Sequence, residues 1–292
     1  MLKDIVFGLF EGATYGMLAV GLVLLYKGTR VFNFAQGEFG TIGAFLVYWM
    51  FEVHHMNYAL AVLLSLLLVV GCGLVMERLV IRPLLGASRI TVLVATVGVA
   101  LLMISCEVLI GKVETRSLSP AITGRPFFVF SAAITPQQLL LLGVLGAVAV
   151  AVILFFRTDR GLSILAASQD ARAARVVGIS VPVTSRIIWG SAALLGAVAG
   201  ILQAPIAGVL SPAFMTGTPG AALIPAFTAA VIGGMDSLVG AFVGGEVVGL
   251  AQGLGFHFLN GHVPGDQDLT VFLVLLVVLL ARPQGLFGRK VA

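Results

Sequence analysis

Long apolar runs separated by short connections are the feature that most limits how this chain can fold. Seven runs lie at roughly 5–26, 31–51, 59–80, 91–110, 137–156, 187–209 and 238–258, and two shorter or broken ones at 220–234 and 269–281. A membrane-spanning helix needs about 20 mostly apolar residues. Charged residues make up only 10% of the chain and the mean hydropathy is +1.11, whereas soluble domains have about 25% charged residues. The sequence therefore predicts an all-α polytopic membrane helix bundle of eight or nine segments, with residues 1–292 in a single transmembrane domain.

The distribution of lysine and arginine predicts the orientation of this bundle. Cytoplasmic loops of membrane proteins are enriched in both residues. If nine segments start from an outer N-terminus, only four of the 17 lysines and arginines lie outside, namely Lys3, Lys112, Arg116 and Arg125. The C-terminus and the segment at about 157–186 are therefore expected to be cytoplasmic.

The segment at about 157–186 is the most highly charged part of the chain. Its seven charged residues are Arg157, Asp159, Arg160, Asp170, Arg172, Arg175 and Arg186. Such groups are costly in lipid, so the segment must face water or another protein. A basic, partly helical segment between membrane helices indicates a cytoplasmic docking surface for a partner that supplies energy or control.

Glycines repeat every four residues in three of the apolar runs. The sets are Gly8, Gly12 and Gly16; Gly196 and Gly200; and Gly245, Gly249 and Gly253. Small residues at this spacing let membrane helices approach closely. The pattern favours close packing within the chain over a dedicated interface between subunits.

Polar residues within or beside the apolar runs are candidates for a substrate path. They are Tyr15, Asn33, Gln36, Glu38 and Glu246, and Glu11 is a weaker candidate. A carboxylate at the bilayer centre costs at least about 2.5 kcal/mol, so it normally faces the bundle interior, a cavity or a partner. The same groups could instead hydrogen-bond between helices and hold them together, and the sequence leaves both interpretations open.

Glycines near Glu38 predict an irregular helix at the start of the second run. Gly37 and Gly40 flank the carboxylate, which needs a hydrogen-bond donor such as Asn33, Tyr15 or a backbone amide if it is buried. A second irregular region follows the sixth run, where Gly208, Pro212, Gly217, Pro219 and Gly220 gather. Non-helical backbone at membrane depth is tolerated only where it is buried in protein or lines a cavity. A substrate path near these two breaks is therefore expected.

Motifs of the common enzymes are missing from the sequence. There is no phosphate-binding loop, no G-x-S-x-G serine and no metal-ligand spacing among the four histidines. The two cysteines, Cys72 and Cys106, lie inside apolar runs and predict no disulfide framework. The chain is thus expected to be a conduit or an energised subunit, with no cofactor of its own and no nucleic-acid partner.

Several motifs resemble one transport family over nearly the whole chain. The most specific is RVFNFAQGEF at residues 30–39, followed by Gly43-Ala44-Phe45. Others are Arg160-Gly-Leu-Ser, Gly178-Ile179, the run from Gly233 to Ala241 and RPQGLF at residues 282–287. Together they resemble LivH-type permeases, the membrane subunits of branched-chain amino-acid ABC importers. Two departures are Gln36, where the family usually has histidine, and Arg172, where the coupling motif has glutamate.

The resemblance implies a set of partners and a role for the charged segment. The partners would be a second, M-type permease subunit, two ATP-binding cassette subunits that bind the ATP, and an extracytoplasmic binding protein, assembled as a hetero-oligomer in the bacterial plasma (inner) membrane. A short helix within Gly161–Gly178, ended by Gly178, would couple to an ATPase through Asp170, Arg172, Ala173, Ala174, Arg175 and Gly178. The path itself is expected to be weakly selective and lined by small and apolar residues. Alternative functions are a urea or short-amide ABC permease, or a self-sufficient channel or secondary transporter.

Overall fold

A computed structural model shows the architecture of the chain. It describes residues 1–292 except 30–31, 85, 113, 130–131, 170–173, 175, 177, 218–220, 260–264, 283 and 289–292. Each of the nine apolar runs contains a helix, and these are α1 (Leu2–Thr29), α2 (Gln36–Tyr48), α3 (Tyr58–Met76), α4 (Arg89–Gly111), α5 (Pro136–Phe155), α8 (Val181–Ala207), α9 (Leu223–Gly233), α10 (Leu238–Leu259) and α11 (Asp266–Ala281). The polytopic all-α fold is therefore confirmed.

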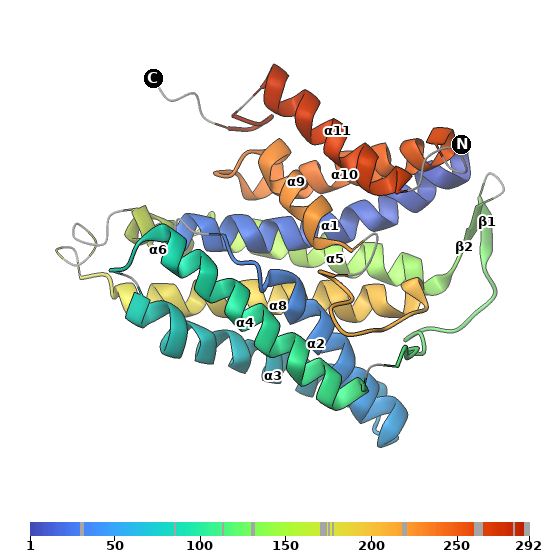
Figure 1. Cartoon of the computed structure of the whole chain (residues 1–292), viewed down its shortest axis with the longest axis horizontal. Coiled ribbons are helices and arrows are strands. Elements are labelled where there is room, and N and C mark those ends of the chain that lie inside the picture. The colour runs from blue at the N-terminus through green and yellow to red at the C-terminus, as the bar shows by residue number, and fades with distance from the viewer. Residues whose placement is uncertain are drawn as a thin grey trace.

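Smaller elements join these helices. The π-helical turns η1 (Trp49–Val53) and η2 (Glu77–Ile81) extend α2 and α3, and a short 3₁₀ turn, η3 (Arg82–Leu84), follows η2. Strands β1 (Phe127–Val129) and β2 (Ala132–Ile134) form an antiparallel hairpin, which projects at the end of the molecule where the chain begins (Figure 1). Helix α6 (Asp159–Gln169) lies at the opposite end.

Six of the described helices are long and apolar enough to cross a membrane, by length and composition. They are α1, α3, α4, α5, α8 and α10, with η2 and η3 continuing the third run. Helices α2, α9 and α11 are shorter, with 13, 11 and 16 residues.

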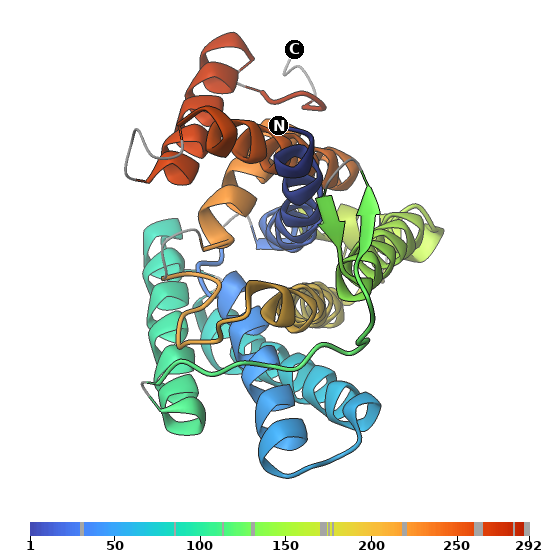
Figure 2. The same ribbon diagram turned by 90° about the vertical axis from the view of Figure 1, so that its right-hand side faces the viewer.

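Helix α1 is the centre of the bundle. In the most apolar stretch of α1, 89% of the residues are buried, whereas only 17% are buried in the corresponding stretches of α4 and α5. Figure 2 shows α1 between the layer of α10 and α11 and the layer that contains α8 and α2. A helix that is apolar all round is expected to be buried. The outer helices α4 and α5 expose apolar side chains, which lipid or another membrane protein would cover.

The glycine repeats of α1 and α10 pack against each other within the chain. A methyl group added at Gly8 would lie 2.4 Å from the carbonyl oxygen of Gly249, and one added at Gly245 would lie 2.2 Å from the Cα of Gly16. The pairing runs in opposite directions along the two helices, so they are antiparallel. The prediction of close packing within the chain is confirmed for this pair.

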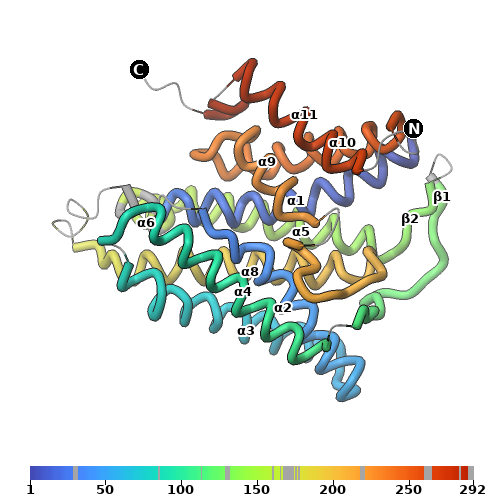
Figure 3. Tube along the Cα trace, viewed as in Figure 1, coloured from blue at the N-terminus to red at the C-terminus, as the bar shows by residue number. Residues whose placement is uncertain are grey.

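The second helix begins later than predicted and leaves a break. Helix α2 starts at Gln36, five residues after the predicted start of its run, because the preceding residues form a turn instead. In this turn Asn33 Oδ1 accepts a hydrogen bond from the Ala35 amide at 3.1 Å. The tube in Figure 3 shows the chain returning from the end of α1 into the bundle before α2 starts.

The predicted irregular region after the sixth run is also present. Helix α8 ends at Gly208, whose φ of +70° ends the helix in the left-handed region. Residues 209–217 are described and form no regular helix. They turn back into the bundle, where the Met215 amide donates to Thr41 Oγ1 of α2 at 3.1 Å. The 209–217 segment therefore packs against the first turns of α2 inside the protein. Backbone outside regular helices is tolerated at membrane depth where it is buried in protein in this way.

Candidate functional site

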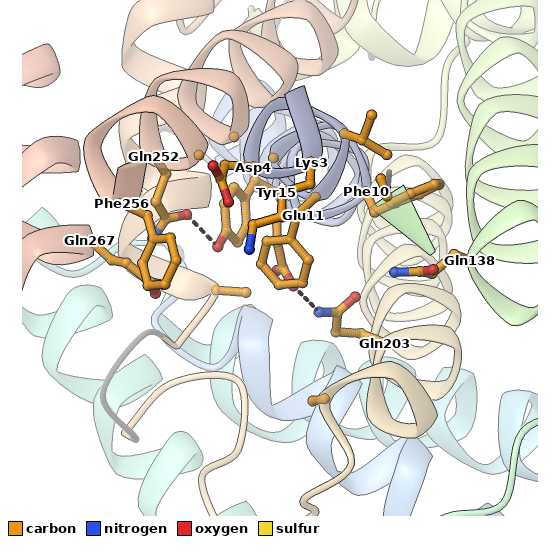
Figure 4. Close-up of a pocket in the computed structure, with 18 of the residues that line it drawn as sticks. Lys3, Asp4, Phe10, Glu11, Tyr15, Gln138, Gln203, Gln252, Phe256 and Gln267 are labelled. Carbon is orange, nitrogen blue, oxygen red and sulfur yellow. Dashed lines mark hydrogen bonds between the residues drawn. The ribbon is translucent and has the colours of Figure 1, made fainter. Parts of the chain in front are cut away.

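A cavity of about 680 Å³ opens beside the first half of α1 (Figure 4). Its walls come from α1, the end of α8, the second half of α10, β2 and the segment after α8. The polar side chains that line it belong to Lys3, Asp4, Glu11, Tyr15, Gln138, Gln203, Ser211, Gln252 and Gln267. The lining also includes apolar side chains, and whether this cavity is part of the predicted weakly selective path stays a prediction.

One face of α1 supplies the central wall of the cavity. Lys3, Phe7, Glu11 and Tyr15 recur every four residues and all line the cavity. Residues at this spacing lie on the same side of a helix. The glycines that pack on α10 each follow one of these cavity residues by one position. Neighbouring faces of α1 therefore line the cavity and pack against α10.

Glu11 is held in this wall by neutral hydrogen-bonding groups. Gln203 Nε2 of α8 donates to Glu11 Oε1 at 2.7 Å, and Thr14 Oγ1 donates to Gln203 Oε1 at 3.1 Å. Tyr15 stands one turn further along the same face of α1. These contacts fix the position of the carboxyl group and add no positive charge to it.

Tyr15 links the cavity wall on α1 to α10. Its hydroxyl donates to Gln252 Oε1 at 2.7 Å. Gln252 is 5% exposed, and its Nε2 has no hydrogen-bond partner among the described residues. Nearer the start of α1, Asp4 Oδ2 lies 2.9 Å from His257 Nδ1 of α10, so the same two helices are joined again at that end.

Of the five predicted path residues, the structure places Tyr15 on the cavity and the other four elsewhere. Gln36 is fully buried between helices and donates from Nε2 to the Ala192 carbonyl oxygen of α8 at 2.9 Å. Glu246 lies on α10 where that helix contacts Gly12. Asn33 belongs to the turn before α2. These residues therefore contact other helices, and whether they influence the path stays a prediction.

Glu38 belongs to a second polar cluster, sealed inside the bundle. It is fully buried and accepts a hydrogen bond from the Thr216 hydroxyl, so a donor is present as predicted, although not one of the residues named as examples. Its carboxyl group lies near that of Glu107 of α4, which is also fully buried and accepts from the Ala213 amide at 3.0 Å. The cluster thereby ties α2 and α4 to the segment after α8.

Several residues of these clusters were not among the sequence candidates. Among them, Glu107, Gln203 and Gln252 are polar residues within long apolar runs, and that contrast was the available signal. Glu11 and Tyr15 stand four residues apart, so their shared face could also be read from the sequence. What the sequence could not provide was the partner helix that each residue faces.

The predicted coupling segment is described in part. Gly178 has φ of +80°, and the Ile179 amide donates to the Ala174 carbonyl oxygen at 2.9 Å, which is the 6→1 bond of a Schellman cap. The prediction that Gly178 ends a helix in the left-handed region is confirmed. Asp170, Arg172, Ala173 and Arg175 lie outside the described residues.

Comparisons with known proteins identify the family. The family described as the permease component of the branched-chain amino acid transport system matches residues 5–281. The chain is 30% identical to the high-affinity branched-chain amino acid transport system permease protein BraD of Pseudomonas aeruginosa, over 99% of this chain and 96% of that protein. It is 28% identical to LivH of Escherichia coli, over 97% of this chain and 94% of LivH.

A solved structure supports the fold. PsaBC from Streptococcus pneumoniae, in complex with a Fab, aligns with a TM-score of 0.50 and 14% identity, covering 98% of both chains. At this identity the likeness concerns the fold alone. The family match spans the glycine-packed core, the cavity-lining helices and the segment with the Gly178 cap. The chain therefore belongs to the family of branched-chain amino acid transport system permeases.

Proposed function

We propose that this permease is the transmembrane subunit of an ATP-driven importer that carries branched-chain or related hydrophobic amino acids. The substrate would be delivered by an extracytoplasmic binding protein, and ATP would be hydrolysed on two ATP-binding cassette subunits. A second, M-type permease subunit would complete the membrane part. In this proposal, residues 1–292 form a single permease domain.

The observation that carries the proposal is the arrangement of two features at opposite ends of α1. The cavity lies along the first half of α1, whereas α6 packs near the other end of α1 and the start of α8. An importer needs a receiving cavity on one side of the membrane and an ATPase contact on the other. The excess of lysine and arginine near α6 supports placing that end in the cytoplasm.

The Gly178 cap supports a rigid contact at the ATPase end. A glycine in the left-handed region ends a helix sharply and fixes the direction of the chain that follows. Here the following chain is α8, which begins at Val181 and runs to Gln203 on the cavity wall. A movement imposed at the cap would therefore be transmitted along one helix to the cavity.

The proposal is tested by copurification and uptake. The chain should copurify with a second permease and two ATPase subunits, and proteoliposomes of this complex with the binding protein should take up leucine, isoleucine or valine only when ATP is present. Urea and short amides in the same panel test the alternative ABC substrates. Uptake by the chain alone without ATP would overturn the proposal and support a channel or secondary transporter.

A further inference from the structure

The Glu11 carboxyl group is available to a cationic ligand in the cavity. Its hydrogen-bond donor is the neutral side chain of Gln203, and none of the salt bridges between described residues includes Glu11. A carboxylate accepts several hydrogen bonds and binds most strongly to a charged donor. An ammonium group in the cavity would supply that donor.

Gln252 presents a complementary group nearby. Its Oε1 accepts from Tyr15, and its buried Nε2 has no acceptor among the described residues. A buried donor without a partner is unfavourable, so an acceptor brought by a ligand would be favoured there. Glu11 and Gln252 line the same cavity, and Tyr15, which donates to Gln252, stands one turn from Glu11 on the same face of α1. The two side chains thus offer an acceptor and a donor in one cavity, which are the partners that the ammonium and carboxylate groups of an α-amino acid require.

The remaining lining suits an aliphatic side chain. Phe7, Phe10, Phe214, Met215 and Phe256 border the cavity around the polar groups. Pockets for small ligands commonly combine an apolar lining with a few polar groups that fix orientation.

We propose that Glu11 and Gln252 form a recognition site for the α-ammonium and α-carboxylate groups of a zwitterionic amino acid within the permease. Glu11 accepts from the ammonium group, and Gln252 Nε2 donates to the carboxylate. The site selects zwitterions after release from the binding protein, so the permease contributes to specificity. This inference rests on the proposed transport function.

The test uses the assembled importer in nanodiscs without its binding protein, and three probes of one shape. Leucine carries both charged groups, 4-methylpentanoate lacks the ammonium group and leucinamide lacks the carboxylate. Binding is followed by saturation-transfer NMR, and ATP-dependent leucine uptake is measured in proteoliposomes with the binding protein. Glu11→Gln removes the charge at one end, and Gln252→Glu removes the donor at the other while keeping an acceptor for Tyr15. Glu114→Gln, at an exposed salt bridge with Arg116 outside the cavity, is the matched control.

Each variant should lose a different preference. Glu11→Gln should weaken leucine binding at least about tenfold and abolish the preference for leucine over 4-methylpentanoate. Gln252→Glu should instead abolish the preference for leucine over leucinamide. Leucine uptake should fall about tenfold in both variants and remain normal in Glu114→Gln. Glu11→Asp, which keeps the charge on a shorter side chain, should keep the preference over 4-methylpentanoate and so separates charge recognition from folding.

The outcomes distinguish this inference from the function on which it rests. If the wild-type complex takes up no amino acid with ATP, the proposed function is wrong. If the wild-type complex transports leucine and Glu11→Gln retains both full uptake and the wild-type preference, the recognition site is wrong and the transport function stands. Equal losses for all three probes in both variants would also overturn the site, because they would indicate general damage to the cavity.

Discussion

The two carboxylate clusters differ in access and in partners. Glu11 lies on the wall of an open cavity, with neutral amide and hydroxyl neighbours that leave room for a ligand. Glu38 and Glu107 are fully buried, and they accept from the Thr216 hydroxyl and the Ala213 amide respectively. An accessible carboxylate can exchange partners during a transport cycle, whereas a sealed pair holds protein segments together.

The sealed pair also differs in what its hydrogen bonds join. Glu38 accepts from the Thr216 hydroxyl and Glu107 accepts from the Ala213 amide, so both carboxyl groups bind the segment after α8. No described residue forms a salt bridge with either group. Two hydrogen bonds to the same segment favour one position of that segment. We therefore expect the sealed cluster to control movement and the open cluster to control ligand preference.

The largest expected effect comes from removing one acid of the sealed pair. Glu38→Leu leaves the Thr216 hydroxyl without its acceptor, and a buried polar group left unpaired costs about 1–3 kcal/mol. Uptake should fall more than about tenfold, and thermal unfolding of the purified complex should occur at a lower temperature. Glu38→Gln keeps both shape and hydrogen bonding and should be mild. Normal assembly with full uptake in Glu38→Leu would show that the sealed cluster has no role in transport.

A substitution at Gly178, which follows α6 in the chain, tests whether coupling to the ATPase is separate from both carboxylate clusters. Gly178 has φ of +80°, and an added Cβ would meet no atom of the described residues within 4 Å. Gly178→Val therefore acts on the backbone, at a cost of about 1–2 kcal/mol for the left-handed conformation. Uptake per ATP hydrolysed should fall about tenfold while binding of leucine to the cavity stays unchanged.

The matched control at this position is Gly178→Asn. Asparagine tolerates the left-handed region better than other side chains, so this variant should transport nearly as well as the wild type. Equal and full transport by the valine and asparagine variants would contradict the coupling role of the cap. Reduced leucine binding in Gly178→Val would contradict the separation between this end and the cavity.

The sequence predicted the apolar helices and named Tyr15 and, more weakly, Glu11 of the open cluster, but it did not predict how the clusters assemble. Apolar runs and glycine spacing are local patterns, so the helices and the small face of α1 follow from them directly. Tyr15 was a candidate, but its partner Gln252 is 237 positions away and depends on the antiparallel packing of α1 and α10. Glu38 of α2 and Glu107 of α4 likewise lie near each other in the folded bundle. Their placement depends on α2 starting at Gln36, and the apolar pattern does not show the turn that precedes this start. Long-range pairing of polar groups is set by tertiary packing, which a single sequence does not display.

The smallest expected effect comes from the hydroxyl that joins the sealed pair to the backbone of the 209–217 segment. Thr216→Val keeps the shape of the side chain and removes the donor to Glu38 Oε1. A net hydrogen bond contributes about 0.5–3 kcal/mol, and the Ala213 amide still binds Glu107 to the same segment, so the loss should be at the lower end. Uptake should fall a few-fold, with leucine preference over 4-methylpentanoate unchanged, because the open cluster is intact. Thr216→Ser keeps the hydroxyl and should restore uptake. If the valine variant changed ligand preference and not rate, the two clusters would act as one site, and the division between an accessible recognition carboxylate and a sealed structural pair would be wrong.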